Sequence, residues 1–319
     1  MATRLSLDEQ SRLRAGLSAV CRQVSLDPDD AVLIKYTMNA VFHLHHADVV
    51  LRLATGPTAA ERVDRVVRVG VAFAELDAPT IRLAAGLPNP VHAGEWSASI
   101  WQAVIDDADR RWAPVDLTGP LRAIHAIKQA PTTVPTWDPV GKSRRRLADL
   151  SLLADSEQRF MHSWAQQVGR SLAHIVDHLG RWCDDLESAL LATEWALPVG
   201  VIHGDAHTGN LLATSDGHTV LGDLDSVAIG PREWDLVPAA HGAHRFARSR
   251  ADYTSFATTY GVDVTTLPGW DILRQTRELQ LVTSVIASLA GRPAVADELA
   301  HRMRTILTGS HTATWHRYQ

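Results

Sequence analysis

The stretch VIHGDAHTGNLLATSDGHTVLGDLD, residues 201–225, is the most informative part of this 319-residue sequence. Its pattern predicts a short apolar strand, a polar loop, a second strand, a turn at Asp216-Gly217 and a third strand. Two histidines, an aspartate and an asparagine lie within its loop, HGDAHTGN. Such residues could form a metal site, the remnant of a hydrolase site, or a loop that positions a hydroxyl group for attack on a phosphate.

The spacing within this loop favours phosphate chemistry. His203, Asp205 and Asn210 follow the pattern H-x-D-x-x-x-x-N, which is the skeleton of the protein-kinase catalytic loop. In that loop the aspartate accepts the proton of the attacking hydroxyl group, and the asparagine holds a magnesium ion. The metal needs a second acid, and Asp223 is suitably placed because the hairpin returns its second strand beside the loop.

A zinc site formed by His203, Asp205 and His207 is the alternative. Transition-metal sites usually also recruit a distant ligand, whereas Asn210 and Asp223 favour a hard ion with oxygen ligands. A polar turn with incidental histidines is the remaining explanation, and the motif that continues after Asp223 argues against it.

The segment 201–236 resembles the signature of the aminoglycoside phosphotransferase and choline kinase-like superfamily. Members pair HGDxHxxN with a second motif, which here comprises Asp223, Gly230 and Trp234-Asp235-Leu236. Weaker similarities cover most of the chain, at Asn39-Ala40-Val41, VVLRL (49–53), SIWQAV (99–104) and AIHAI (123–127).

The resemblance implies a role for each matching residue. Asp205 would be the catalytic base or would orient the substrate hydroxyl group, and Asn210 and Asp223 would bind magnesium. Arg52 would replace the usual lysine on the α- and β-phosphates. The other implied positions are Asn39 in the nucleotide loop, Trp101 at the hinge beside the nucleotide base, and His203, His207 and Asp235 as structural residues.

Several departures from the family pattern bear on this site. An arginine at position 52 keeps the usual positive charge but presents a planar fork of donors, which changes the geometry of the phosphate contacts. The helix acid that should pair with Arg52 is not evident, and Glu61 and Asp64 are the candidates. Gly222 replaces a large aliphatic residue, and Thr208 stands where proline is frequent.

The first third of the chain is expected to alternate strands with one long helix. Ser6 and Glu9 are spaced as in a capping box and predict an N-terminal helix that begins there. Residues 57–76 carry apolar side chains at helical spacing over about five turns. Strands are expected at residues 31–55, 78–85 and 97–104. Turns near Asn39 and at residues 45–48 divide the first of these segments into shorter strands.

From about residue 103 onward the pattern is mainly helical. Helices are expected at residues 116–127, 143–185, 232–247, 251–261 and 273–291. The predicted fold class is α+β, a two-lobed protein-kinase-like fold with a small strand-rich N-lobe and a larger, mainly helical C-lobe. We expect a nucleotide-binding lobe at residues 1–101 and a catalytic and substrate-binding lobe at residues 102–319.

Composition and charge narrow the range of partners. The net charge of −5 gives no basic footprint for nucleic acid, and no apolar run reaches the roughly 18 residues that span a bilayer. The N-terminus lacks the apolar core of a secretory signal. Cys21 and Cys183 lie far apart and outside any CxxC motif, which indicates a reducing compartment. We therefore expect a cytoplasmic protein with no nucleic-acid or membrane partner.

Other charged or histidine-rich runs are expected to be solvated surface. HLHH (43–46) lies at a predicted turn, and alternate residues there point to opposite faces. The basic run Lys142 to Arg146 is expected to begin a helix, with an anionic substrate as the alternative partner. The acidic runs are Asp106-Asp107-Asp109 and Asp184-Asp185-Glu187.

The predicted function is magnesium-dependent transfer of the γ-phosphoryl group of ATP or GTP to a hydroxyl group of a small molecule. The acceptor is expected to lie against the C-terminal helices, from about residue 235 to residue 319. An antibiotic is the leading acceptor class because this is the best-known role of the resembling family. The alternatives are a metabolic compound (an amino alcohol, a sugar or a nucleoside) or a catalytically silent kinase-like binding module. The sequence does not indicate the oligomeric state.

Overall fold

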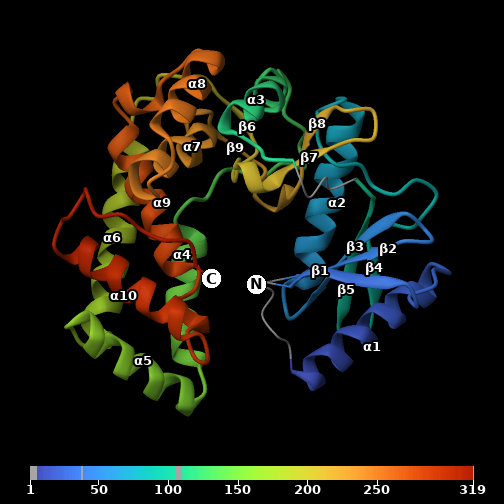
Figure 1. Ribbon diagram of the computed structural model, residues 1–319, viewed down its shortest axis with the longest axis horizontal. Coiled ribbons are helices and arrows are strands. Elements are labelled where there is room, and N and C mark those ends of the chain that lie inside the picture. Colours follow the sequence, from blue (N-terminus) through green and yellow to red (C-terminus); the bar gives the residue numbers. More distant parts are fainter. Residues whose placement is uncertain (1–5, 37–38, 105–109, 319) are drawn as a thin grey trace. The chain divides into compact units, whose positions relative to one another are not determined.

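The computed structural model describes residues 6–36, 39–104 and 110–318 (Figure 1). By packing, the chain divides into two compact units. The N-terminal unit comprises Met1–Pro135 and His203–Ile229, and the C-terminal unit comprises Thr136–Ile202 and Gly230–Gln319. The predicted division at residues 101/102 refers to nucleotide and acceptor binding, which packing does not test, so it stays a prediction.

An antiparallel sheet of five strands forms the centre of the N-terminal unit, in the order β1-β2-β3-β5-β4. The strands expected at residues 31–55 and 97–104 are confirmed, and the short strand β4 was not predicted. The bounds are β1 (Ala31–Tyr36), β2 (Ala40–Leu44), β3 (Val49–Thr55), β4 (Val91–Ala93) and β5 (Trp96–Gln102).

The strand expected at residues 78–85 is wrong. This segment forms only isolated bridges, at Thr80 and Leu83. Its backbone changes partner midway, because the N–H of Ile81 donates to Leu221 whereas the N–H of Ala84 donates to Ile100. The β-branched residues favoured a strand, but a segment that bonds to two different elements cannot continue one ladder.

One helix packs on each face of this sheet (Figure 1). Helix α1 (Leu7–Gln23) begins with the predicted Ser6–Glu9 capping box. Its buried side chains form a core with the sheet residues Phe42, Leu51 and Ile100. Helix α2 (Ala59–Glu75) covers the opposite face, where Gly70 lies against the ring of Trp101. Because side chains alternate along a strand, Arg52 points away from the α1 core and toward the α2 side.

The hairpin that follows the polar loop belongs to the N-terminal unit. Backbone hydrogen bonds join Leu221 to Pro79 and to Ile81, and so tie the hairpin to the segment after α2. The predicted order of strand, loop, strand, turn and strand is confirmed. The elements of this region are η1 (Pro114–Leu117), α3 (Thr118–His125), β6 (Val199–Ile202), η3 (Thr208–Asn210), β7 (Leu211–Ala213), β8 (Thr219–Leu221), η4 (Leu224–Ser226) and β9 (Ala228–Pro231).

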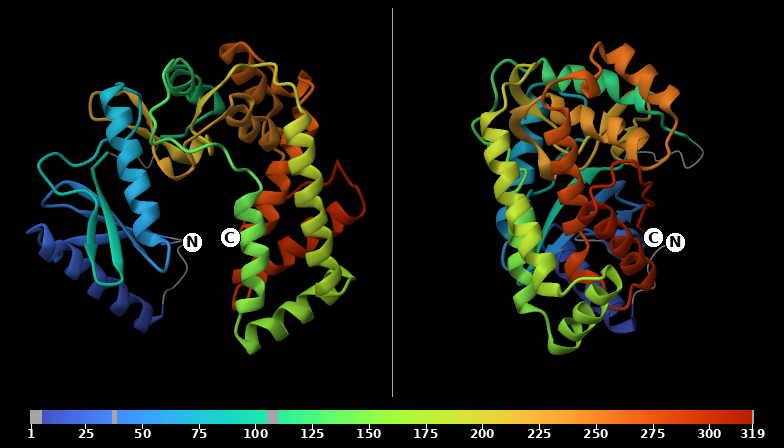
Figure 2. Two further views of the ribbon diagram at one scale, coloured as in Figure 1. Left: turned by 180° about the vertical axis from the view of Figure 1, so that it is seen from behind. Right: turned by 90° about the vertical axis from the view of Figure 1, so that its left-hand side faces the viewer.

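The C-terminal unit consists mainly of helices (Figure 2). The long helix expected at residues 143–185 is interrupted, because Gly169 adopts a left-handed conformation after α5 and Ser171 caps α6. Helix α10 was not predicted. The bounds are α4 (Gly141–Ala148), η2 (Asp149–Leu152), α5 (Asp155–Val168), α6 (Leu172–Ala192), α7 (Glu233–Arg245), α8 (Arg250–Tyr260), η5 (Val264–Thr266), α9 (Trp270–Thr283), η6 (Ile286–Ser288) and α10 (Pro293–Leu307).

The charged and histidine-rich runs are only partly exposed where the structure describes them: His45, His46, Lys142 and Arg145 are exposed, whereas His43, Arg144 and Arg146 are half-buried. Arg144 forms ion pairs with Asp184 and Glu187, at 2.6 and 2.9 Å. His45-His46 is exposed in the turn between β2 and β3. The acidic run Asp106-Asp107-Asp109 lies outside the described residues.

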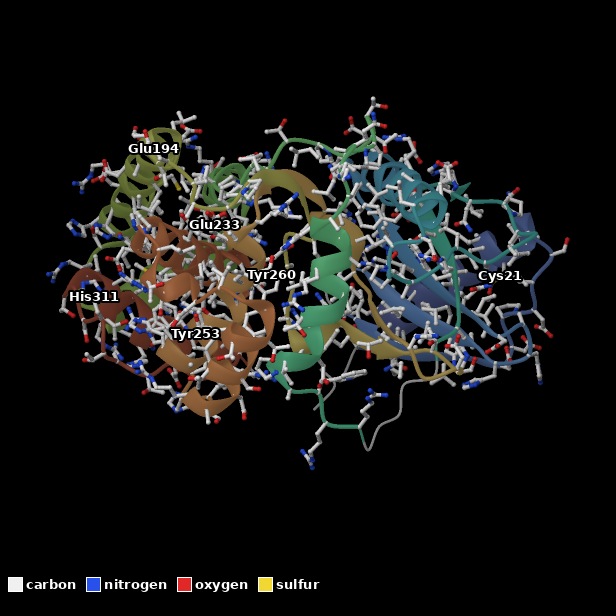
Figure 3. The ribbon with its side chains drawn as sticks, turned by 90° about the horizontal axis from the view of Figure 1, so that it is seen from above. Cys21, Glu194, Glu233, Tyr253, Tyr260 and His311 are labelled. Carbon is white, nitrogen blue, oxygen red and sulfur yellow. The ribbon has the colours of Figure 1, made fainter. Side chains whose placement is uncertain are left out.

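Both cysteines are buried free thiols, Cys21 on α1 (Figure 3) and Cys183 on α6. Burial raises the pKa of each thiol to about 11, so both stay protonated at neutral pH. Within the described part of the chain, no helix combines the length and the apolar character that crossing a bilayer requires.

Candidate active site

His203 anchors the polar loop from inside the protein. Its side chain is fully buried, and its Nε2–H donates to the carbonyl oxygen of Gly222 at 2.9 Å. Its Nδ1 accepts a hydrogen bond from the backbone N–H of Asp205 at 3.4 Å. Both ring nitrogens therefore hold the protein backbone, which supports a structural role and argues against zinc binding by this histidine.

Gly204 allows the loop to approach the segment after β8 closely. Its φ of +82° lies in the left-handed region, which favours glycine. A Cβ atom at this position would lie 2.0 Å from the carbonyl oxygen of Ser226. The contact brings the loop that carries Asp205 against η4, the turn directly after Asp223.

Asn210 is buried and joins the loop to the hairpin. Its side-chain Nδ2–H donates to the backbone carbonyl of Asp205 at 3.0 Å, which orients the amide oxygen away from that carbonyl. The backbone oxygen of Asn210 accepts the N–H of Gly222 at 2.8 Å. The structure therefore brings Asp205, Asn210 and Asp223 together through backbone contacts. Their chemical roles stay predictions.

Asp223 is strained and electrostatically unfavourable as an isolated anion. It is a non-glycine residue with φ 59° and ψ 65°, a conformation that costs on the order of 1–3 kcal/mol and is common at functional sites. Burial raises the pKa of its carboxyl group, and the charges of Asp225 and Asp205 raise it further, against the opposing effect of Arg52. A bound cation would relieve this repulsion. An amide oxygen from Asn210 and a carboxylate from Asp223 are oxygen donors of the kind that magnesium prefers, so these residues fit that ion.

Arg52 reaches the same segment from β3. Its Nη2 contacts Oδ2 of Asp225 at 2.6 Å and Oδ1 of Asp223 at 3.2 Å. Its Nη1 is buried and has no hydrogen-bond partner among the described residues. A buried donor without an acceptor is costly, so this nitrogen is a candidate contact for an anionic ligand such as a phosphate.

The prediction that Glu61 or Asp64 pairs with Arg52 is corrected by the structure. Asp64 instead contacts Nε2 of His92 at 3.0 Å, and Glu61 is exposed. The acids that hold Arg52 come from the segment after β8, in which Asp223 and Asp225 contact this residue of β3 and η4 packs against α2.

The two remaining predicted nucleotide contacts, Asn39 and Trp101, differ in exposure. Asn39 directly precedes β2 and is half-buried, and its Oδ1 accepts a hydrogen bond from Nη2 of Arg62 at 3.1 Å. Trp101 is only 2% exposed, and its indole N–H donates to Oγ of Ser99 at 2.8 Å. The ring of Trp101 is part of the core. A nucleotide base bound near this position would therefore contact the residues around Trp101 and not its ring. Nucleotide binding by both residues stays a prediction.

Comparison with known proteins places this geometry in a family. Residues 37–275 match the sequence model of the phosphotransferase enzyme family. The chain belongs to this family. The resemblance expected from the polar loop and its second motif is thereby confirmed. No curated protein matches the sequence.

Solved structures of phosphotransferases and kinases share the fold of this family member. A choline/ethanolamine kinase family protein from Mesorhizobium loti has 15% identity and a TM-score of 0.55, over 94% of each chain. Aminoglycoside phosphotransferase APH(3'')-Id from Streptomyces rimosus has 16% identity and a TM-score of 0.55, over 84% of this chain and 98% of that one. Spectinomycin phosphotransferase APH(9)-Ia, solved with ADP and spectinomycin, has 13% identity and a TM-score of 0.54, over 96% and 93% of the chains. The predicted two-lobed, kinase-like α+β fold class is confirmed.

Two residues of the site in this family member were missed by sequence reasoning. Asp225 lies two residues after Asp223, and the run DLD was visible, but only its first acid was assigned. Arg62 lies one residue after a candidate acid, Glu61, and contacts the Asn39 side chain. No sequence signal distinguished Arg62 from the other arginines of α2.

Proposed function

We propose that this protein transfers the γ-phosphoryl group of ATP or GTP to a hydroxyl group of a small molecule, with magnesium. The observation that carries this proposal is the set of backbone contacts that hold Asp205, Asn210 and Asp223 together beside Arg52. A polar turn without function would not need a strained aspartate, a buried arginine and a glycine in close contact with a facing backbone.

Each side chain has a distinct part in the proposed reaction. Asp205 would orient the acceptor hydroxyl group and take up its proton as the oxygen attacks the γ-phosphorus. Asn210 and Asp223 would hold the magnesium ion, which when bound neutralises charge on the phosphate oxygens. Arg52 would donate to the phosphates through Nη1. Catalysis of this kind depends mainly on positioning and charge neutralisation.

An antibiotic is the first acceptor class that we propose. Among the structures of similar fold are enzymes whose names include aminoglycosides and spectinomycin, which supports this class. A choline/ethanolamine kinase family protein among them supports the second class, a metabolic hydroxyl compound. A catalytically silent binding module is the third candidate, and the presence of Asp205, Asn210 and Asp223 argues against it. The acceptor would lie against the helices at residues 235–319, in a cytoplasmic protein.

A panel of hydroxylated antibiotics and metabolites tests this proposal. The purified protein is incubated with each compound, magnesium and ATP or GTP, and the mass of each compound is then measured by mass spectrometry. We expect at least one acceptor to gain the mass of one phosphate, and chelation of magnesium to stop the reaction. Nucleotide binding without transfer to any member of a broad panel would favour the silent module instead.

Loss of a metal ligand should raise the magnesium requirement. For Asn210→Ala and for Asp223→Asn we expect the half-saturating magnesium concentration to rise by about tenfold or more, because the first variant loses an oxygen ligand and the second loses the negative charge of one. Magnesium titration of phosphoryl transfer measures this effect. Asp216→Asn is the matched control, since Asp216 is an exposed acid in the turn of the same hairpin. An unchanged magnesium dependence in the Asn210 or Asp223 variant would remove that residue from the metal site.

A further inference from the structure

The partners of Arg52 come from an unexpected part of the chain. Both acids that contact its guanidinium group lie in the segment after β8, and Asp225 is the nearer, at 2.6 Å against 3.2 Å for Asp223. The side chain of Asp225 is mostly buried. A short contact between two mostly buried, charged groups fixes the plane of the guanidinium group more firmly than a solvent-exposed contact would.

Helix α2, which packs against η4, contributes a second arginine, Arg62. Arg62, on the first turn of α2, donates to Oδ1 of Asn39 at 3.1 Å. The turn η4, against which α2 packs, contains Asp225. Asp225 therefore contacts a cation from β3 directly and lies in a turn packed against the helix that carries Arg62.

The two acids cannot serve Arg52 equally once a metal is bound. Asp223 would then ligate magnesium, and its contact with Arg52 is already the longer one. Asp225 would keep its contact with Nη2, and Nη1 would remain the donor without a partner among the described residues. In this arrangement Nη2 of Arg52 binds the carboxylate of Asp225, and Nη1 is available to bind a ligand such as a phosphate.

We infer that Asp225 is a positioning residue that holds Arg52 for the triphosphate, in place of an acid from helix α2. Arg62 then adds a second positive charge on the side of the Asn39 loop. This inference rests on the proposed function, since it assigns to Arg52 the phosphates of the nucleotide. A competing assignment would make Asp225 a further metal ligand, and the two roles have different consequences.

Nucleotide affinity separates these roles. A positioning residue for Arg52 affects binding of the nucleotide even without magnesium, whereas a metal ligand affects binding only when magnesium is present. Calorimetric titration of ATP and GTP is therefore carried out with magnesium and with EDTA. For Asp225→Asn we expect affinity to fall by about tenfold or more in both conditions, because a buried charge pair loses one partner.

A double-mutant cycle then tests the coupling to Arg52. We expect Arg52→Gln to weaken nucleotide binding as much as Asp225→Asn does, and the double variant to be little weaker than either single variant. Glu61→Gln and Asp64→Asn are matched controls, since they are acids of α2 that do not contact Arg52 in the structure, and both should bind like the wild type. Asp225→Glu keeps the carboxylate and should bind more tightly than Asp225→Asn, which excludes general unfolding as the cause.

Several outcomes would overturn the inference. Wild-type affinity in Asp225→Asn, additive losses in the cycle, or a loss seen only with magnesium would each exclude the positioning role. A loss in Glu61→Gln or Asp64→Asn as large as that in Asp225→Asn would return the role to α2. Absence of nucleotide binding by the wild-type protein would instead contradict the proposed function itself, so the two failures are distinguishable.

Discussion

Replacement of Asp205 by alanine is expected to lower kcat by roughly 10²- to 10⁴-fold, the range for loss of a general base. The backbone of this residue helps to hold the loop. Its N–H donates to His203, and its carbonyl oxygen accepts from Asn210. Alanine keeps both backbone contacts, so the variant should retain the loop backbone while it loses the carboxylate and its 3.8 Å contact with His207.

Steady-state kinetics at saturating nucleotide and magnesium measure this effect, with an acceptor found in the panel. The affinity for nucleotide should change little, because Asp205 is assigned to the acceptor and not to the phosphates. Asp216→Ala serves as the control, since it removes an exposed acid from the same hairpin. A kcat close to the wild-type value in Asp205→Ala would show that another group accepts the proton. A parallel loss of nucleotide binding would show that the loop had rearranged.

The parts of the site that could be predicted from the sequence are those that depend on local structure. The hairpin β7–β8 places Asn210 beside Gly222, and therefore close to Asp223, through the register of two short strands and one turn. The strands and the turn have local signals, namely apolar runs and the pair Asp216-Gly217. These local signals are sufficient to predict that Asp205, Asn210 and Asp223 lie close together.

The partners of Arg52 depend on packing between distant segments. Arg52 lies on β3, and its acids lie beyond β8, so their contact follows from the way α2, the sheet and η4 pack together. No local pattern reports such packing, and the family pattern pointed to Glu61 or Asp64 instead. For the same reason the burial of Trp101 could not be predicted: it depends on Gly70, a residue of α2 whose missing side chain makes room for the ring.

Replacement of Glu278 is expected to have the second large effect, a loss of stability of the C-terminal unit. This residue of α9 is only 3% exposed, and its Oε1 accepts hydrogen bonds from Nε of Arg245 at 2.7 Å and from Nη1 of Arg274 at 3.0 Å. For Glu278→Gln we expect the free energy of unfolding to fall by about 3–5 kcal/mol at neutral pH, because buried Arg245 loses its carboxylate partner and buried Arg274 keeps only its contact with the exposed Asp271. Urea unfolding followed by circular dichroism measures this loss.

The same network predicts how stability depends on pH. Burial by itself would raise the pKa of Glu278, but its contacts with His241 and the two arginines lower it from 4.5 to about 2. A lowered carboxyl pKa stabilises the folded state above the unfolded value of 4.5, and this contribution, of about 3 kcal/mol, is lost as pH falls toward 2. Burial also lowers the pKa of His241 from 6.5 to about 4. Between these pH values the unfolded chain binds a proton at His241 that the folded chain does not, so the folded state loses stability as pH falls.

Both groups therefore act in the same direction, and acid should destabilise the C-terminal unit in two overlapping steps. Glu278→Gln should remove the step below pH 4.5, so that its unfolding free energy depends less on pH there than that of the wild type. Glu187→Gln is the control, since Glu187 forms an exposed ion pair with Arg144 and should lose less than about 1 kcal/mol. A Glu278 variant that unfolds like this control, or that keeps the full acid dependence, would show that the buried arginines find other acceptors.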